Sequence, residues 1–150
     1  MKSLFKKNIV IIGLTLVIPG IISFLIKDSF ATYKSLVQPK FSPPAYIFPI
    51  AWSILYILMS IAAIMVKEND KCLKIYYLQL FLNIIWTPIF FGFNNYLLGL
   101  IDLIFLLGTV IYMTYIFYKE DNKTIYLLLP YVLWLLFALY LNYFVYLYNW

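Results

Sequence analysis

The sequence contains no histidine, one cysteine (Cys72) and only six acidic residues in 150. A single cysteine leaves no partner for an internal disulfide. Without histidine and without a cluster of carboxylates, neither a zinc site nor a histidine-based acid/base relay can be assembled. These absences argue against ordinary hydrolysis or group-transfer chemistry.

Charged residues are scarce, at 11%, whereas 65% of the residues are hydrophobic and 21% are aromatic. A soluble domain of this length cannot bury so much apolar surface. Five apolar stretches reach or approach the roughly 20 residues that cross the hydrocarbon core of a bilayer. They are residues 8–26, 45–66, 75–92, 96–118 and 125–148. Because only a helix satisfies its own backbone within such a run, we predict an all-α integral membrane bundle of five transmembrane helices. Residues 1–150 are expected to form a single domain.

The first apolar stretch follows three lysines and could be read as a signal peptide that is cleaved near residues 29–31. Its apolar run is longer than the usual 7–15 residues, and Lys27 and Asp28 lie against the cleavage position. We therefore expect a retained helix.

All eleven basic residues are lysines, and they are distributed unevenly. Eight of them lie in the amino-terminal tail and in the second and fourth loops, which share one side of the membrane, and three lie in the first loop on the other side. This asymmetry predicts a cytoplasmic amino terminus and an external carboxyl terminus, and we expect a bacterial-type plasma membrane. The net charge of +5 then reflects orientation and affinity for anionic lipid, and no nucleic-acid partner is expected.

The loop between the first two spans, residues 27–44, is the longest connection and ends in QPKFSPP. Long loops in compact chains commonly act as lids or form parts of sites. Pro43 and Pro44 stop a helix from continuing backward, yet proline suits the first turn of the helix that follows. We expect this first loop to act as a lid, and Pro49 to bend the second helix or tighten its first turns. Residues 92–95 are expected to form a tight turn.

A stripe of amide and aromatic residues marks one face of the third span. Within LQLFLNIIWTPIFFG (residues 78–92), candidate positions recur at steps of four, three and four, so they project from one side of a helix. Since a polar stripe is costly against lipid, this face should point into the bundle. The second and fifth spans repeat the pattern, each with one indole. The candidate ligand-binding residues are Pro49, Trp52, Tyr56, Gln79, Asn83, Trp86, Phe90, Trp134, Ala138 and Asn142.

These side chains predict a mostly apolar, flat-walled cavity with few polar groups, as small-ligand sites tend to be. The alternative is purely structural, because intramembrane amides often bridge helices and aromatic residues form belts at the membrane interface. Asp102 is the only carboxylate inside a predicted span. An intramembrane acid can belong to a proton pathway, but no second buried acid, histidine or lysine is available, so a structural hydrogen bond is the favoured role.

Four stretches resemble the translocator protein family, which includes the tryptophan-rich sensory proteins and the peripheral-type benzodiazepine receptors. They occur in order across four of the five predicted helices. They are KFSPPAYIFPIAWSILYILM (residues 40–59), LQLFLNIIWTPIFFG (residues 78–92), LLGLIDL (residues 97–103) and LPYVLWLLFALYLN (residues 129–142).

The resemblance implies a five-helix bundle, commonly a homodimer, that binds tetrapyrroles such as protoporphyrin IX and isoquinoline carboxamide or benzodiazepine ligands. By matched position, the resemblance places six residues in the pocket and the first loop over its mouth. These are Trp52, Asn83, Trp86, Trp134, Ala138 and Asn142. Animal members carry a cholesterol-recognition pattern that needs a basic residue near the carboxyl end; here no lysine follows Lys123, so sterol binding is not expected.

The leading hypothesis is therefore a membrane receptor or scavenger of porphyrins, with no obligatory cofactor and with porphyrin as ligand or substrate. Lacking histidine, the commonest axial ligand of haem, the pocket should prefer a metal-free porphyrin. A second hypothesis is light-dependent porphyrin degradation, with Trp52 and Trp134 as photochemical participants. A porphyrin or small-molecule transporter, and a structural or regulatory membrane subunit, are the remaining alternatives.

Overall fold

A computed structural model describes residues 1–149, which form helices joined by turns and contain no strand. Five helical segments are long and apolar enough to cross a membrane. They are α1 (Lys2–Leu25), α3 (Ile47–Met65), α4 (Asp70–Thr87) with its π-helical extension η2 (Pro88–Gly92), α5 (Tyr96–Glu120) and α6 (Thr124–Tyr148). The expected all-α, five-helix membrane bundle is confirmed.

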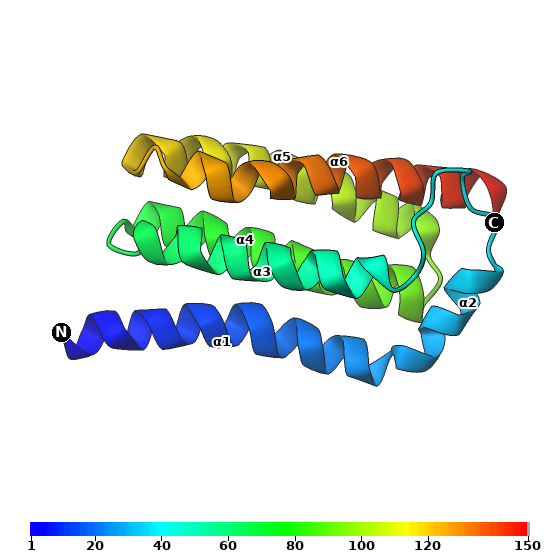
Figure 1. Cartoon of the computed structure of the whole chain (residues 1–150), viewed down its shortest axis with the longest axis horizontal. Coiled ribbons are helices and arrows are strands. Elements are labelled where there is room, and N and C mark those ends of the chain that lie inside the picture. Colours follow the sequence, from blue (N-terminus) through cyan, green and yellow to red (C-terminus); the bar gives the residue numbers. More distant parts are fainter. Residues whose placement is uncertain (150) are drawn as a thin grey trace.

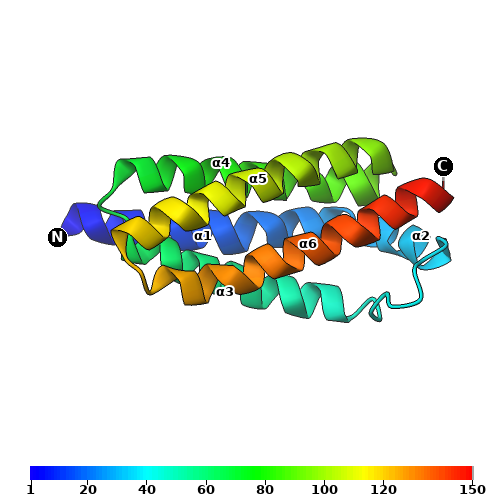
Figure 2. The same cartoon turned by 90° about the horizontal axis from the view of Figure 1, so that it is seen from above.

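The long helices run antiparallel along one axis, and the two ends of the chain lie at opposite ends of the bundle (Figure 1). Helix α5 packs mainly against α6 and α4, while α3 packs against α6 and α1. Seen from above, α1 lies behind the other helices and leads into the first loop (Figure 2). This arrangement places the start of α3, the end of α4 and the first loop at the same end of the molecule.

Helix α1 is the least buried of the long helices. Its buried residues are Ile11, Thr15 and Pro19. The Thr15 hydroxyl lies 2.6 Å from the hydroxyl of Tyr76 in α4, and both side chains are fully buried. One polar contact within the hydrocarbon region thus joins α1 to the rest of the bundle.

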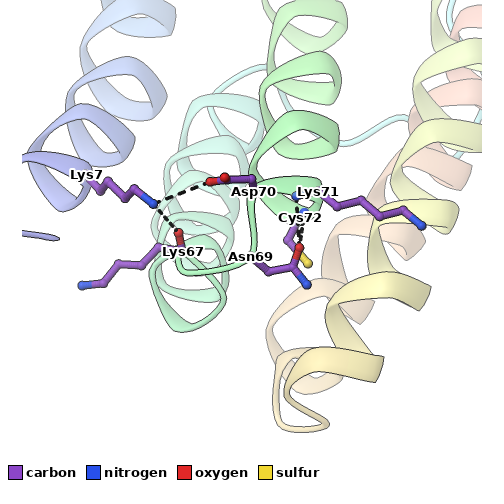
Figure 3. Close-up of polar contacts among 6 residues, drawn as sticks. All are labelled: Lys7, Lys67, Asn69, Asp70, Lys71 and Cys72. Carbon is purple, nitrogen blue, oxygen red and sulfur yellow. Dashed lines mark hydrogen bonds and ion pairs between the residues drawn. The ribbon is translucent and has the colours of Figure 1, made fainter. Parts of the chain in front are cut away.

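Side-chain contacts at the amino-terminal end fix the start of α4 (Figure 3). The Asn69 side chain accepts hydrogen bonds from the backbone amides of Lys71 and Cys72, so it caps the helix in the usual way. The Lys7 ammonium donates to the carbonyl oxygen of Lys67 at 3.1 Å and lies 3.7 Å from the Asp70 carboxylate. These contacts hold the α3–α4 turn against α1.

A tight turn joins α4 to α5, as the sequence predicts. Asn94 has φ of 51°, a left-handed conformation that asparagine adopts more readily than most residues. The next residue, Asn95, caps α5 by accepting a hydrogen bond from the backbone of Leu98 at 2.9 Å.

The first loop contains two short helices, η1 (Lys27–Ser29) and α2 (Phe30–Ser35), and then an irregular segment, residues 36–46, which we call the strap. The strap passes beside the carboxyl-terminal end of α6 before it returns to α3 (Figure 1). Pro43 and Pro44 lie just before the turn that starts α3, and Pro49 lies in the first turn of that helix, where proline is tolerated.

Candidate functional site

A small cavity lies where α3, α4, η2 and α6 meet the first loop. Its volume is about 20 Å³, which is about the space that one water molecule needs. Its walls are almost entirely aromatic and aliphatic. The lining residues are Tyr33, Phe48, Trp52, Trp86, Phe90, Phe91, Trp134, Ala138, Leu141 and Asn142.

Three helices each contribute one indole to this cavity. Trp52 from α3 and Trp134 from α6 meet edge to face, with ring centroids 6.3 Å apart and ring planes at 87°. Trp86 from α4 stacks on Phe90 at 5.0 Å. Aromatic pairs at these distances and angles attract beyond their burial alone, so the rings form a continuous wall.

The π-helical turn η2 brings two successive phenylalanines to the site. The backbone amide of Phe93 donates to the carbonyl oxygen of Pro88, five residues back, which is the π-helical pattern. In a regular α-helix, Phe90 and Phe91 would point about 100° apart. Here both rings line the cavity, with centroids 4.8 Å apart.

Tyr33 closes the cavity from the side of the first loop. Its ring lies 5.7 Å from Phe48, 6.0 Å from Phe90 and 5.5 Å from Phe91, all measured between centroids. Burial raises the pKa of the Tyr33 phenol above its ordinary value, so the hydroxyl stays neutral at physiological pH. The loop therefore adds an uncharged aromatic cover.

Asn142 ties together the three helices beside the cavity. Its side-chain oxygen accepts a hydrogen bond from the indole N–H of Trp86 at 3.1 Å, and its side-chain amide donates to the backbone carbonyl of Tyr96 at 2.9 Å. Gly99 makes this approach possible, because a Cβ there would lie 3.1 Å from the Asn142 side-chain oxygen. This amide therefore already bridges α4, α5 and α6.

A buried polar network centred on Tyr131 of α6 lies next to the cavity. The Tyr131 hydroxyl accepts from the side-chain amide of Asn83 at 2.7 Å and donates to the side-chain oxygen of Gln79 at 2.8 Å. The Tyr56 hydroxyl donates to the side-chain oxygen of Asn83 at 2.8 Å. Since Trp52 stacks on Tyr56 and meets Tyr131 edge-on, this network also supports the indole above it.

Two buried polar atoms have no hydrogen-bond partner within residues 1–149. One is the indole nitrogen of Trp134, a residue that lines the cavity. The other is Oδ2 of Asp102, whose side chain is buried in α5. The structural hydrogen bond expected for Asp102 is thus not made by this oxygen. Buried donors and acceptors are nearly always paired, so the free indole N–H points to an acceptor that a ligand or a water supplies.

Six of the ten residues predicted from the sequence line the cavity: Trp52, Trp86, Phe90, Trp134, Ala138 and Asn142. Tyr56, Gln79 and Asn83 instead belong to the buried network beneath it. Pro49 is exposed and lies away from the lining.

Four lining residues, Tyr33, Phe48, Phe91 and Leu141, did not emerge from the sequence. Phe48 lies four residues before Trp52, so the helical spacing that selected Trp52 could also have found Phe48. Leu141 is one of many leucines in α6, and nothing in its context distinguishes it. Tyr33 and Phe91 depend on the fold of the first loop and on the π-helical turn, which spacing does not predict.

The chemistry of the site is that of a binding pocket with few ionisable groups. Residues 1–149 contain no group of three or more histidine, cysteine or carboxylate side chains that could hold a metal ion. Flat aromatic walls suit a flat, apolar ligand, and the amides and indoles provide few polar contacts.

The fold and the cavity together define a class: an integral membrane protein of five helices with an aromatic pocket enclosed by the bundle and its first loop. The TspO/MBR family model matches residues 10–147. The chain is 38% identical to the tryptophan-rich protein TspO of Archaeoglobus fulgidus over 133 residues, which cover 85% of this chain and 86% of that protein. It is 33% identical to the human translocator protein over 128 residues, covering 80% and 76%. It is also 38% identical to the protein CrtK of Rhodobacter capsulatus over 120 residues, covering 75% of each chain. The chain belongs to the TspO/MBR family.

Proposed function

We propose that this protein is a membrane receptor or scavenger that binds a metal-free tetrapyrrole, such as protoporphyrin IX, between α3, α4 and α6. The observation that carries the proposal is the convergence of Trp52, Trp86 and Trp134 from three helices on one cavity. A tetrapyrrole presents a broad π-face, and stacking against indoles while leaving water would supply much of the affinity. Isoquinoline carboxamide and benzodiazepine ligands are flat as well and would use the same walls.

The free indole N–H of Trp134 supports a ligand that has an acceptor group. A carboxylate, carbonyl or ring nitrogen on the ligand would satisfy this buried donor. The absence of histidine from the sequence disfavours axial ligation of haem iron, so a metal-free ring is the better candidate.

Binding requires the cavity to enlarge. A volume of about 20 Å³ holds one water molecule at most, whereas small-molecule pockets are typically about 300–1,000 Å³. The aromatic cover from the first loop, represented by Tyr33, is the part of the wall that can withdraw without separating the long helices. In this proposal the described conformation is a closed state, and a ligand enters when this loop withdraws.

The direct test is a titration with protoporphyrin IX in the dark, followed by quenching of tryptophan fluorescence. We expect saturable binding to the unaltered protein, weakened by Trp134→Phe, which removes the free N–H, and by Asn83→Ala, which breaks the network below Trp52. The control is Tyr126→Phe, a change to an exposed residue at the opposite end of the bundle. Equal affinity in all four proteins, or no saturable quenching, would overturn the proposal.

Light-dependent degradation of the bound porphyrin is a second candidate function. It is favoured by the direct contact of Trp52 and Trp134 at the cavity wall, because an indole beside an excited porphyrin can donate an electron to it or react with singlet oxygen. Repeating the titration under illumination separates bleaching from binding. Bleaching that persists when all three cavity tryptophans are replaced by phenylalanine would exclude their participation.

We further propose that the amino-terminal end of the bundle faces the cytoplasm of a bacterial-type cell. The amino terminus, the α3–α4 turn and the α5–α6 turn lie at this end (Figure 1), and eight of the eleven lysines lie in them or in the adjoining helix ends. Positive charge of this kind is retained on the cytoplasmic side. We also expect a homodimer, on the basis of family membership alone.

A further inference from the structure

The carboxyl-terminal end of α6 holds the strap of the first loop through one side chain, Asn149. Its side-chain oxygen accepts a hydrogen bond from the backbone amide of Val37 at 2.6 Å, and its side-chain amide donates to the carbonyl oxygen of Val37 at 2.8 Å. Residues 112 positions apart in the sequence are thereby joined by two hydrogen bonds, both to the backbone of one residue, Val37.

Asn149 is held in place for this contact by the end of the helix. Its backbone amide donates to the carbonyl oxygen of Val145 at 3.0 Å, and its side-chain amide also reaches that oxygen at 3.2 Å. The last carbonyls of a helix lack partners within the regular hydrogen-bond pattern, so a side-chain donor at the C-cap position satisfies one of them. The side chain is thus oriented before it meets the strap.

The strap is locally ordered by its own contacts, so it can move as a unit. The side-chain amide of Gln38 donates to the carbonyl oxygen of Tyr33 at 2.8 Å, and its side-chain oxygen accepts from the hydroxyl of Ser42 at 2.9 Å. These bonds connect the strap to the residue that covers the cavity. We therefore expect a displacement of Val37 to move Tyr33 as well.

We propose that Asn149 is a latch: it holds the strap closed over the cavity and sets how often Tyr33 withdraws to admit a ligand. The latch suits frequent opening because Val37 is 54% exposed, so water can replace the two hydrogen bonds when they break. The identity of the ligand rests on the proposed function, but the latch does not.

The test uses a thiol in the cavity wall and needs no ligand. Ala138→Cys places the thiol at a lining position that is 7% exposed, and Cys72, 1% exposed in the first turn of α4 at the opposite end, serves as the internal reference. Labelling by N-ethylmaleimide is followed at both positions by mass spectrometry of peptides. Asn149→Ala is then introduced into the Ala138→Cys protein. Asn122→Ala, at the opposite end of the bundle, is introduced separately into the same protein as the matched control.

We expect Asn149→Ala to raise the labelling rate at position 138 by about tenfold, the effect of losing two exposed hydrogen bonds, and to leave the rate at Cys72 unchanged. Val37→Pro, which removes the N–H donor from the other side of the contact, should raise the same rate. An unchanged rate at position 138 in Asn149→Ala, or equal acceleration at both thiols in both variants, would overturn the latch.

A second measurement is the kinetics of porphyrin binding. It uses proteins that keep Ala138. Both the association and the dissociation rate constants of protoporphyrin IX should rise in Asn149→Ala, because a strap that opens more often lets the ligand enter and leave faster. If the unaltered protein does not bind the porphyrin, the proposed function fails while the labelling result still decides the latch.

Discussion

Tyr131 is fully buried, and its one hydroxyl satisfies two side chains, Asn83 and Gln79, which are themselves almost completely buried. Removing that oxygen would leave an amide donor and an amide acceptor in the hydrocarbon region without partners. Leaving such groups unpaired costs more than an ordinary hydrogen bond contributes, because water is absent to replace the lost partner. The network is therefore sensitive to a single atom.

We predict that Tyr131→Phe destabilises the protein by about 1–2 kcal/mol. The measurement is thermal or denaturant unfolding in detergent. Tyr126→Phe provides the matched control, since that side chain is 79% exposed and should show almost no change. A Tyr131→Phe protein as stable as the control would mean that the network relaxes and finds other partners.

Gly99 offers a sharper test at the scale of one methyl group. Gly99→Ala would place a Cβ 3.1 Å from the Asn142 side-chain oxygen, so that oxygen must move away slightly and we expect its hydrogen bond to the Trp86 indole N–H to lengthen. We expect a loss of about 1–3 kcal/mol in unfolding free energy and a shift in tryptophan emission.

The control for Gly99→Ala lies in the same helix. A Cβ on Gly108 meets no atom of the described residues within 4 Å, so Gly108→Ala should be neutral or stabilise α5 by up to about 1 kcal/mol through helix propensity. Equal effects at the two glycines would show that the close approach at Gly99 is not specific.

Among the elements, α1 depends on few contacts for its place in the bundle. With three buried residues, it gains less from packing than the other long helices, and the hydroxyl pair of Thr15 and Tyr76 contributes a larger share. Interhelical hydrogen bonds in membranes stabilise by about 0.6–2 kcal/mol. The position of α1 should therefore respond to a change at Thr15.

Thr15→Val keeps the shape of the side chain and removes the bond, so we expect faster hydrogen exchange in α1 and a loss of about 0.6–2 kcal/mol in stability. Thr109→Val is the matched control, because the Thr109 hydroxyl bonds only to the Phe105 carbonyl of its own helix. If exchange in α1 is the same in both variants, the hydroxyl pair does not hold this helix.

The sequence predicted elements better than it predicted the direction of side chains. Long apolar runs determine the helices because the bilayer admits few other structures, and the Trp52, Trp86 and Trp134 positions followed from helical spacing. Spacing did not select Phe91, which lines the cavity from the π-helical turn, where the backbone leaves the α-helical pattern. Pro49 was chosen by the same rule, but the first turn of α3 leaves it on the exposed side.

Tyr33 illustrates a different limit. The length of the first loop predicted a lid, but which loop residue reaches the cavity depends on α2 and on the contacts of the strap, which join distant parts of the chain. Asn83 and Gln79 show the same limit for polar residues. Their inward face was predicted, whereas their pairing with Tyr131 required knowledge of how α6 sits against α4.

For the whole molecule, the arrangement of lysines predicts a fixed orientation in the membrane. A carboxyl-terminal fusion to alkaline phosphatase should be active in bacteria, because the enzyme folds only outside the cytoplasm, and a carboxyl-terminal fusion to a green fluorescent protein should be dark. The reverse pattern would place the cavity end toward the cytoplasm and would contradict the lysine rule.

The turn at Pro88–Gly92 has a consequence for comparing this protein with its relatives. A π-helical turn is an α-helix that has taken in one additional residue, and every side chain beyond it is rotated with respect to those before it. Two chains can therefore agree letter by letter up to Thr87 and still show different rings to the pocket, if one of them lacks the insertion. In this turn, the backbone conformation determines which aromatic rings line the pocket as much as the amino-acid sequence does.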